Sequence, residues 1–139
     1  MFECDSEGDS VKICCKSKDG GDHSKVVGYF LFEAKKLGSI VLLRFDEGSR
    51  EAFHTHAFNA ISWVLAGKLR ERLIDGTEYM LTPSIMPVYT ERERFHRVFG
   101  ESSKTYVLSF RGPWRKVWRE YLPAEDREIK LTNGRIEIQ

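Results

Sequence analysis

From residue 26 onward, short apolar runs alternate with Gly, Pro, Asp and Ser along the chain. The runs are rich in Val, Ile, Leu, Phe and Tyr, and most of them have the length of a β-strand. In order they are VVGYFLFEA, SIVLLRF, NAISWVLAG, KLRERLI, EYML, SIMPVY, FHRVF and TYVLSF. Such closely spaced strands predict a sandwich, a jelly roll or a small barrel. A parallel α/β fold is disfavoured because no long amphipathic segment separates the runs.

The segment PWRKVWREYL has a different periodicity. Trp114, Val117, Trp118 and Tyr121 follow the i, i+3, i+4, i+7 spacing, and Pro113 suits a first helical turn. We therefore expect one short helix there, with its aromatic edge on the barrel.

The C-terminal sequence EIKLTNGRIEI predicts a β-hairpin over residues 128–138. Asn133 and Gly134 separate two alternating apolar segments, and both residue types tolerate the positive φ of a tight hairpin turn. The expected fold class is all-β, an antiparallel jelly roll with one short helix and this hairpin.

The first 24 residues are polar and rich in Gly. We expect residues 1–24 to form a loosely held arm and residues 25–139 to form a single domain. The cysteines Cys4, Cys14 and Cys15 are odd in number, and two of them are adjacent, so a disulfide framework is not expected. Free thiols are one interpretation, and a zinc site with His23 is another, although the spacing matches no familiar zinc motif.

The charge balance argues against some partners. The 22 basic and 21 acidic side chains nearly cancel, which gives no overall field for a polyanion such as nucleic acid. No apolar run approaches the roughly 18 residues that span a bilayer, and the first residues do not resemble a secretory signal. We expect a cytoplasmic protein that acts on a small molecule, without nucleic acid or membrane.

Three of the four histidines have spacings that suit a metal site. His54 and His56 are two apart, so on a strand both would face one side, and His96 begins a later apolar strand. Three imidazoles suit zinc, iron, nickel, manganese or copper and leave coordination positions open for water or a ligand. Alternatively, each histidine is a surface residue or a hydrogen-bonded core residue.

The stretch from Gly48 to Gly67, with His54 and His56 between them, resembles the first cupin motif. Residues 87–96, which begin with a proline and end with a histidine, resemble the second motif. The similarity covers roughly residues 40–110 and implies an RmlC-like jelly roll of the cupin superfamily. Within it, HTHAFNAISWVLAGKLRE, ERFHRV and SFRGPW are most similar to small phage-encoded cupin-like proteins, which would place the chain in a host cytoplasm.

The chain departs from the cupin pattern at two points. Ala60 or Ile61 stands where the first motif has a Glu ligand, and the second motif lacks its glycine. The resemblance therefore implies a divalent metal (Fe, Zn, Mn or Ni) held by His54, His56 and His96. Three neutral imidazoles leave the ion its full charge, which favours an anionic ligand.

Several arginines are candidates for holding such a ligand, because a guanidinium can grip a carboxylate or phosphate with paired hydrogen bonds. We select Arg70, Arg94 and Arg111, together with Tyr106 as an aromatic contact. The alternative is that the arginines are solvated and that the tyrosine belongs to the core.

Three functions remain open. The first is a metal-dependent enzyme acting on a small polar or anionic molecule. The second is a non-catalytic cupin that binds or sequesters a metabolite or nucleotide, and the third is a structural protein with a degenerate site. A homodimer is also expected, because the segment after Val26 and the 128–138 hairpin would both offer strand edges.

Overall fold

The computed structural model describes residues 2–4, 11–19, 26–49, 53–56, 58–114, 117–122, 127–132 and 136–138. All regular elements in these ranges are β-strands. The strands are β1 (Phe2–Glu3), β2 (Lys12–Lys18), β3 (Val26–Ala34), β4 (Gly38–Ser49), β5 (Phe53–His54), β6 (Ala60–Ala66), β7 (Leu69–Leu73), β8 (Glu78–Leu81), β9 (Val88–Thr90), β10 (His96–Arg111), β11 (Val117–Leu122), β12 (Arg127–Thr132) and β13 (Ile136–Ile138).

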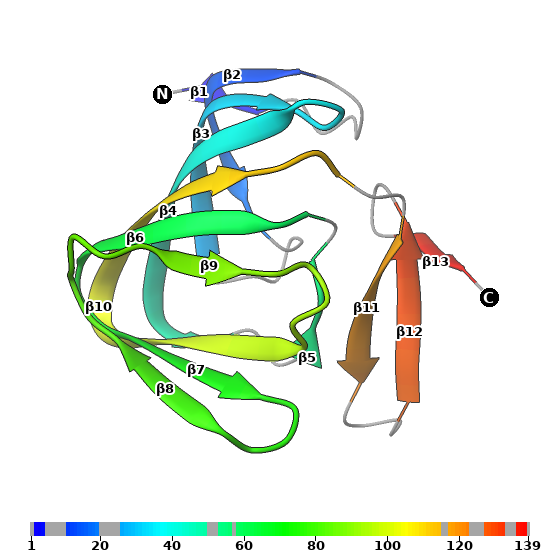
Figure 1. The fold of residues 1–139 in the computed structure, drawn as a ribbon. Helices are drawn as coiled ribbons and strands as arrows, with labels where there is room; N and C mark the ends of the chain where they lie inside the picture. Colours follow the sequence, from blue (N-terminus) through cyan, green and yellow to red (C-terminus); the bar gives the residue numbers. More distant parts are fainter. Residues whose placement is uncertain are drawn as a thin grey trace.

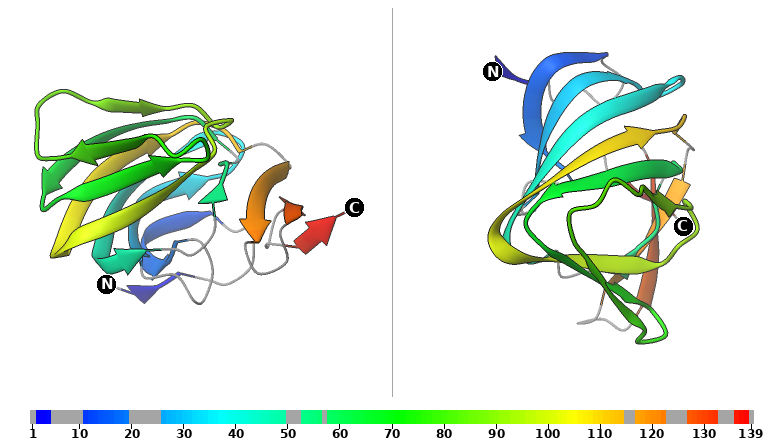
Figure 2. Two further views of the ribbon diagram at one scale, coloured as in Figure 1. Left: turned by 90° about the horizontal axis from the view of Figure 1, so that it is seen from below. Right: turned by 60° about the vertical axis from the view of Figure 1, so that its left-hand side comes forward.

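The strands curl into a roll, with β11 and β12 standing beside it (Figures 1 and 2). The main path runs β1-β2-β3-β4-β10-β5-β11-β12-β13, while β6 and β7 branch from β10 and pair in turn with β9 and β8. All pairs are antiparallel except β1 with β2. The predicted all-β jelly roll is confirmed, and the eight apolar runs all lie in or overlap these strands.

Strand β10 connects the two sides of the roll. Its first residues pair with β7, and its last residues pair with both β4 and β6. The register with β4 shifts between Gly100 and Lys104, which is where the strand bends. A side chain at Gly100 would collide with the backbone oxygen of Asp46, so the close approach at this bend requires glycine.

The main core lies inside the roll, between strands that the sequence separates widely. Alternate residues of β3, such as Val26 and Phe30, are buried, as the period of a strand with one covered face predicts. The buried cluster consists of Cys15, Val26, Phe30, Val41, Leu43, Val64, Leu69 and Val107. A second, smaller cluster joins the roll to β12 and contains Phe58, Ala60 and Leu131.

The predicted helix over residues 113–122 is wrong. Residues Val117–Leu122 form β11, which pairs with β12 on one side and with β5 on the other. The helical spacing of apolar residues could not reveal this pairing, because valine, tryptophan and tyrosine also favour strands when partners are available.

The predicted C-terminal hairpin is confirmed in its strands. Strand β12 pairs with β13 antiparallel, with Lys130 opposite Ile138 and Thr132 opposite Ile136. The Asn133-Gly134 turn lies outside the described residues.

The N-terminal segment differs from two expectations. We placed the start of the core after residue 24, but β2 pairs with β3, and Cys15 belongs to the buried cluster. Cys4 and Cys15 form a disulfide, whereas Cys14 is exposed and free. The expectation of no disulfide was therefore wrong, because the β1–β2 pairing brings distant cysteines together. His23 lies outside the described residues.

Strand β3 is not a sheet edge, because it pairs with β2 and with β4. The prediction that the segment after Val26 offers an unpaired strand edge for a dimer is therefore wrong. Among the described strands, β13 of the C-terminal hairpin is the last in the strand order, as expected for an edge strand. Within the described residues, no helix could cross a membrane.

Candidate functional site

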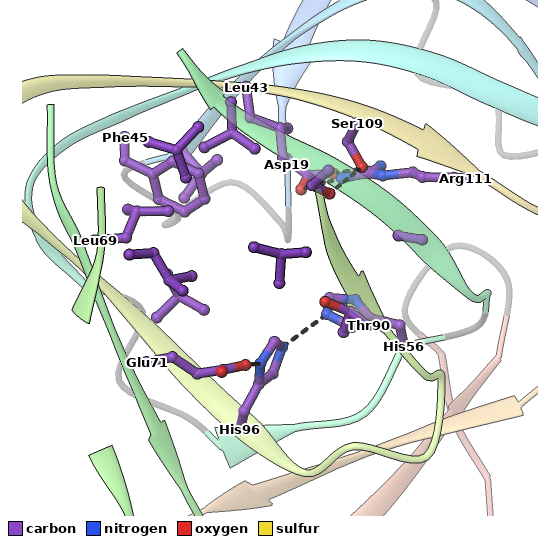
Figure 3. A pocket seen from close by; sticks show the side chains of 18 of the residues that line it. Asp19, Leu43, Phe45, His56, Leu69, Glu71, Thr90, His96, Ser109 and Arg111 are labelled. Atoms are coloured by element: carbon purple, nitrogen blue, oxygen red, sulfur yellow. Dashed lines mark hydrogen bonds and ion pairs between the residues drawn. The ribbon is translucent and has the colours of Figure 1, made fainter. Parts of the chain in front are cut away.

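A cavity of about 110 Å³ opens inside the roll. This volume has room for several water molecules or for a small organic molecule. Most of its wall is apolar, with Leu43, Val64 and Val107 among the lining residues. Figure 3 shows two polar groups of side chains on opposite sides of this space, one around His96 and one around Arg111.

The two-residue period of the strands determines which side chains reach the cavity. On β6 these are Ala60, Ser62 and Val64, and on β7 they are Leu69 and Glu71.

Strand β10 supplies His96 and Val98 before its bend, and Val107, Ser109 and Arg111 after it. Residues 98 and 107 are nine positions apart, and in a regular strand an odd separation puts the two side chains on opposite faces. The register shift between Gly100 and Lys104 separates these two groups, so both ends of one strand face the same cavity.

On one side of the cavity, His56 and His96 face each other. Their Nε2 atoms lie 2.9 Å apart, and their ring planes are inclined by 81°. His96 is buried, and its Nδ1 atom lies 2.6 Å from Oε2 of Glu71. The site thus contains a chain of three polar side chains from Glu71 through His96 to His56.

Glu71 is held by two partners. Its side chain is 5% exposed, and Arg94 donates to both carboxylate oxygens, from Nε at 3.0 Å and from Nη2 at 2.9 Å. Burial alone would raise the pKa of Glu71, but the hydrogen bonds from His96 and Arg94 lower this pKa to about 2. The carboxylate is therefore ionised near neutral pH and only accepts hydrogen bonds.

The ionised carboxylate selects one form of the His96 ring. Because Glu71 only accepts, Nδ1 of His96 carries a hydrogen, and in the neutral ring the lone pair lies on Nε2, toward His56. Metal-binding histidines in proteins commonly have a carboxylate on the nitrogen that does not bind the metal. The two Nε2 atoms are therefore a donor pair of the kind that suits a divalent metal.

His56 lies in the segment after β5, which backbone hydrogen bonds hold on two sides. The His56 N–H donates to the carbonyl of Arg92 at 3.0 Å, and the Thr55 N–H donates to the carbonyl of Arg119 at 2.8 Å. The buried hydroxyl of Thr55 accepts from the Arg119 N–H at 2.8 Å. These contacts fix the position from which the His56 ring enters the cavity.

The third predicted histidine is described only in its backbone. His54 in β5 pairs with His96 in β10, so the two positions are direct neighbours across the strands. The His54 side chain lies outside what the structure describes. Among the described residues, no group of three or more His, Cys, Asp or Glu side chains could hold a metal.

The opposite side of the cavity contains an ion pair. Arg111 donates from Nη1 to Oδ1 of Asp19 at 3.2 Å and from Nη2 to Oδ2 at 2.9 Å. The Arg111 guanidinium also lies over the Phe58 ring, 4.6 Å from its centroid. Beside this pair, the hydroxyl of Ser62 donates to the hydroxyl of Ser109 at 3.0 Å.

The four predicted ligand contacts occupy different places. Arg111 lines the cavity, and Arg94 reaches the site through Glu71. Arg70 forms an ion pair with Glu101 at 3.0 Å and does not line the cavity. Tyr106 precedes the cavity-lining Val107 on β10 and therefore belongs to the opposite face of that strand.

Sequence reasoning missed both acidic residues of the cavity. Glu71 had a detectable signal, because in LRERL it is in phase with Leu69 and Leu73 rather than with the arginines. An acidic residue on the apolar phase of a strand indicates a buried carboxylate. Asp19 had no comparable signal, since it lies in a polar segment 92 residues from its partner.

No family model matches the chain, and no curated protein matches it in sequence. Solved structures do resemble it. The polyketide cyclase RemF from Streptomyces resistomycificus has a TM-score of 0.61 at 18% identity, covering 73% of this chain and 75% of that chain. A sugar phosphate isomerase from a cupin superfamily, from Silicibacter pomeroyi, has a TM-score of 0.60 at 13% identity, covering 91% and 85%.

An RmlC-like cupin from Shewanella frigidimarina has a TM-score of 0.54 at 17% identity, covering 83% of this chain and 92% of that chain. At these identities the similarity shows the fold alone. The fold is that of cupin jelly rolls, as the histidine motif led us to expect.

Proposed function

We propose that this protein is a metal-binding member of the cupin superfamily that acts on a small polar or anionic molecule. His54, His56 and His96 would hold the metal, which would be Fe, Zn, Mn or Ni. When bound, such an ion polarises a ligand oxygen or activates a bound water molecule.

The observation that carries the proposal is the pair of Nε2 atoms of His56 and His96, which lie 2.9 Å apart. Two imidazoles that turn the same ring nitrogen toward each other gain one hydrogen bond at most, whereas a cation between them could use both lone pairs. Glu71 and Arg94 support this interpretation, because they orient the ring of His96 from its other nitrogen.

Elemental analysis of untagged protein tests the metal. We expect stoichiometric divalent metal in the parent after reconstitution, and its loss from His56→Ala and His96→Ala. His23→Ala is the matched control, since it removes the one histidine outside the predicted set and should leave the metal content unchanged. Equal metal content in the parent and His96→Ala would refute the proposed site.

A variant of Glu71 tests whether this residue positions the His96 ring for metal binding. Glu71→Gln keeps all histidines but replaces the charged carboxylate that accepts from Nδ1–H of His96 with a neutral amide. We expect metal affinity to fall by roughly 10–100-fold, the usual effect of losing such a partner. Unchanged affinity would show that Glu71 serves only the fold.

A non-catalytic binding cupin is the second candidate. Ala60 lines the cavity in the region where the cupin motif has a glutamate, and the described carboxylates of the cavity, Asp19 and Glu71, are each held by an arginine. A cavity whose acids are occupied in this way can hold a ligand without supplying a base. NMR spectra of small acids incubated with metal-loaded protein separate the two functions, because only an enzyme converts them into other compounds, including isomers of the same mass.

A further inference from the structure

We infer that Asp19 occupies the anion site of Arg111 and that a small carboxylate ligand with an apolar body displaces it. The inference rests on the proposed function only in taking the cavity as the ligand site, and it does not depend on the metal. It assigns a role to Asp19, which was not a candidate from the sequence, and it narrows the ligand class.

The burial of the two partners is the first argument. The Arg111 side chain is 4% exposed, whereas the Asp19 side chain is 29% exposed. A buried guanidinium needs an anion, because leaving its charge uncompensated is strongly unfavourable. Asp19, as the more exposed partner, can return to water when another anion takes its place.

The two partners are also anchored independently. The backbone N–H of Asp19 donates to the carbonyl of Val26 at 2.8 Å, so the backbone of residue 19 stays attached to β3 when the side chain turns away from Arg111. Arg111 stays in place without Asp19, because it belongs to β10 and its guanidinium packs on the Phe58 ring. The planar fork that now holds Asp19 would hold a ligand carboxylate with the same paired geometry.

Charge and lining identify the ligand. Exchanging one carboxylate for another leaves the charge of the cavity unchanged, whereas a phosphate dianion would add an uncompensated charge. Leu43, Val64 and Val107 give the cavity an apolar lining. Ser109 lies beside Arg111 (Figure 3), and its hydroxyl accepts a hydrogen bond from the hydroxyl of Ser62. A small acid with an apolar chain fits this arrangement.

The test is an NMR titration of chelator-treated protein with straight-chain carboxylates from acetate to hexanoate. The matching neutral amides and inorganic phosphate serve as comparison probes. In the parent, carboxylates should shift the signals of the Asp19 amide and the Arg111 side chain saturably, and the amides should not. Carboxylate titrations that leave both signals unmoved would overturn the inference, even if no variant folds.

Variants then measure the competition. If Asp19 blocks the site, Asp19→Asn should bind carboxylates at least about tenfold more tightly, because a larger fraction of the protein is competent to bind. Arg111→Lys should bind them more weakly, since an ammonium lacks the fork.

Asp46→Asn is the matched control, as it removes the same charge from a surface pair with Arg44, 3.3 Å away on β4. It should leave carboxylate affinity unchanged. Equal affinity of Asp19→Asn and parent, or an equal gain in Asp46→Asn, would overturn the inference. The titrations use metal-free protein, so they test the carboxylate site alone. The proposed metal site is tested separately, by elemental analysis.

Discussion

The two polar sides of the cavity are built from the same chemical groups with opposite burial. In the Glu71–Arg94 pair the carboxylate is 5% exposed and the arginine 33%, whereas in the Asp19–Arg111 pair the arginine is 4% exposed and the carboxylate 29%. One side therefore buries an anion and the other side buries a cation.

The difference shows that an ion pair cannot be interpreted from its partners alone. Glu71 is held by Arg94 and His96 together, which suits a fixed support for the imidazole. Asp19 is partly exposed and faces a buried guanidinium that also packs on the Phe58 ring. We interpret the first pair as a fixed support and the second as an exchangeable contact.

The largest expected effect comes from neutralising each carboxylate. Glu71→Gln should lower the free energy of unfolding by about 3 kcal/mol, because an amide group would face the donors of Arg94 and His96. Asp19→Asn should cost a similar amount, about 3 kcal/mol, because it leaves the buried guanidinium of Arg111 without its anion. Urea unfolding of metal-free protein measures both, and an Asp19→Asn variant as stable as the parent would contradict the importance of this ion pair.

Acid should weaken the support at Glu71. The pKa of this carboxyl is lowered from 4.5 to about 2 in the folded state. The ionised form therefore stabilises the fold above about pH 4.5, and this contribution of about 3 kcal/mol is lost as the pH falls toward 2. Unfolding free energies of metal-free protein between pH 6 and pH 2 measure the loss.

The same pH series on Glu71→Gln is the control. This variant should lack the part of the acid dependence that belongs to residue 71. Parallel pH profiles of parent and variant would show that other carboxyl groups account for the acid sensitivity.

Removing the Cys4–Cys15 disulfide should destabilise the side of the cavity that contains Asp19 more than the side that contains Glu71. Cys4 and Cys15 close a loop with a sequence separation of 11, and Asp19 follows β2 directly. Cys4→Ser should cost about 2.8 kcal/mol, slightly less than the value of about 3 kcal/mol for a 15-residue loop, because the effect changes slowly with loop length. Hydrogen exchange should become faster at Asp19 and remain unchanged at Glu71.

Cys14→Ser is the matched control for this prediction, because Cys14 is an exposed free thiol beside the bridge. It should leave stability and exchange rates at their parent values. Faster exchange at Glu71 in Cys4→Ser would mean that the bridge stabilises the whole roll rather than its N-terminal side.

The smallest effect is expected at Tyr106, which belongs to the face of β10 away from the cavity. Tyr106→Phe should change the free energy of unfolding by no more than about 0.5 kcal/mol and leave carboxylate binding unchanged. A loss of binding in the NMR titration would restore the ligand role that the sequence suggested for this residue.

Much of the fold could be predicted from local patterns. The run VVGYFLFEA coincides with β3, and EYML coincides with β8, because a short apolar run bounded by turn residues is a local property. The helix prediction over residues 113–122 failed because a pairing partner decides between helix and strand where both patterns are present. The disulfide was missed for the same reason, since strand pairing brings Cys4 to Cys15.

The sequence by itself determined an all-β jelly roll and a C-terminal hairpin, and it identified His56 and His96 as candidate metal ligands. Each of these predictions depends on residues close together in the chain or on a short motif. The tertiary structure decided which charges meet. Pairing of β10 with β7 brings His96 to Glu71 across 25 positions, and the register shift after Gly100 lets the far end of β10 face the same cavity, where Arg111 meets Asp19 across 92 positions. Pairing between charges depends on distance in space, which no local pattern encodes, although the burial of Glu71 has a local signal in the phase of LRERL.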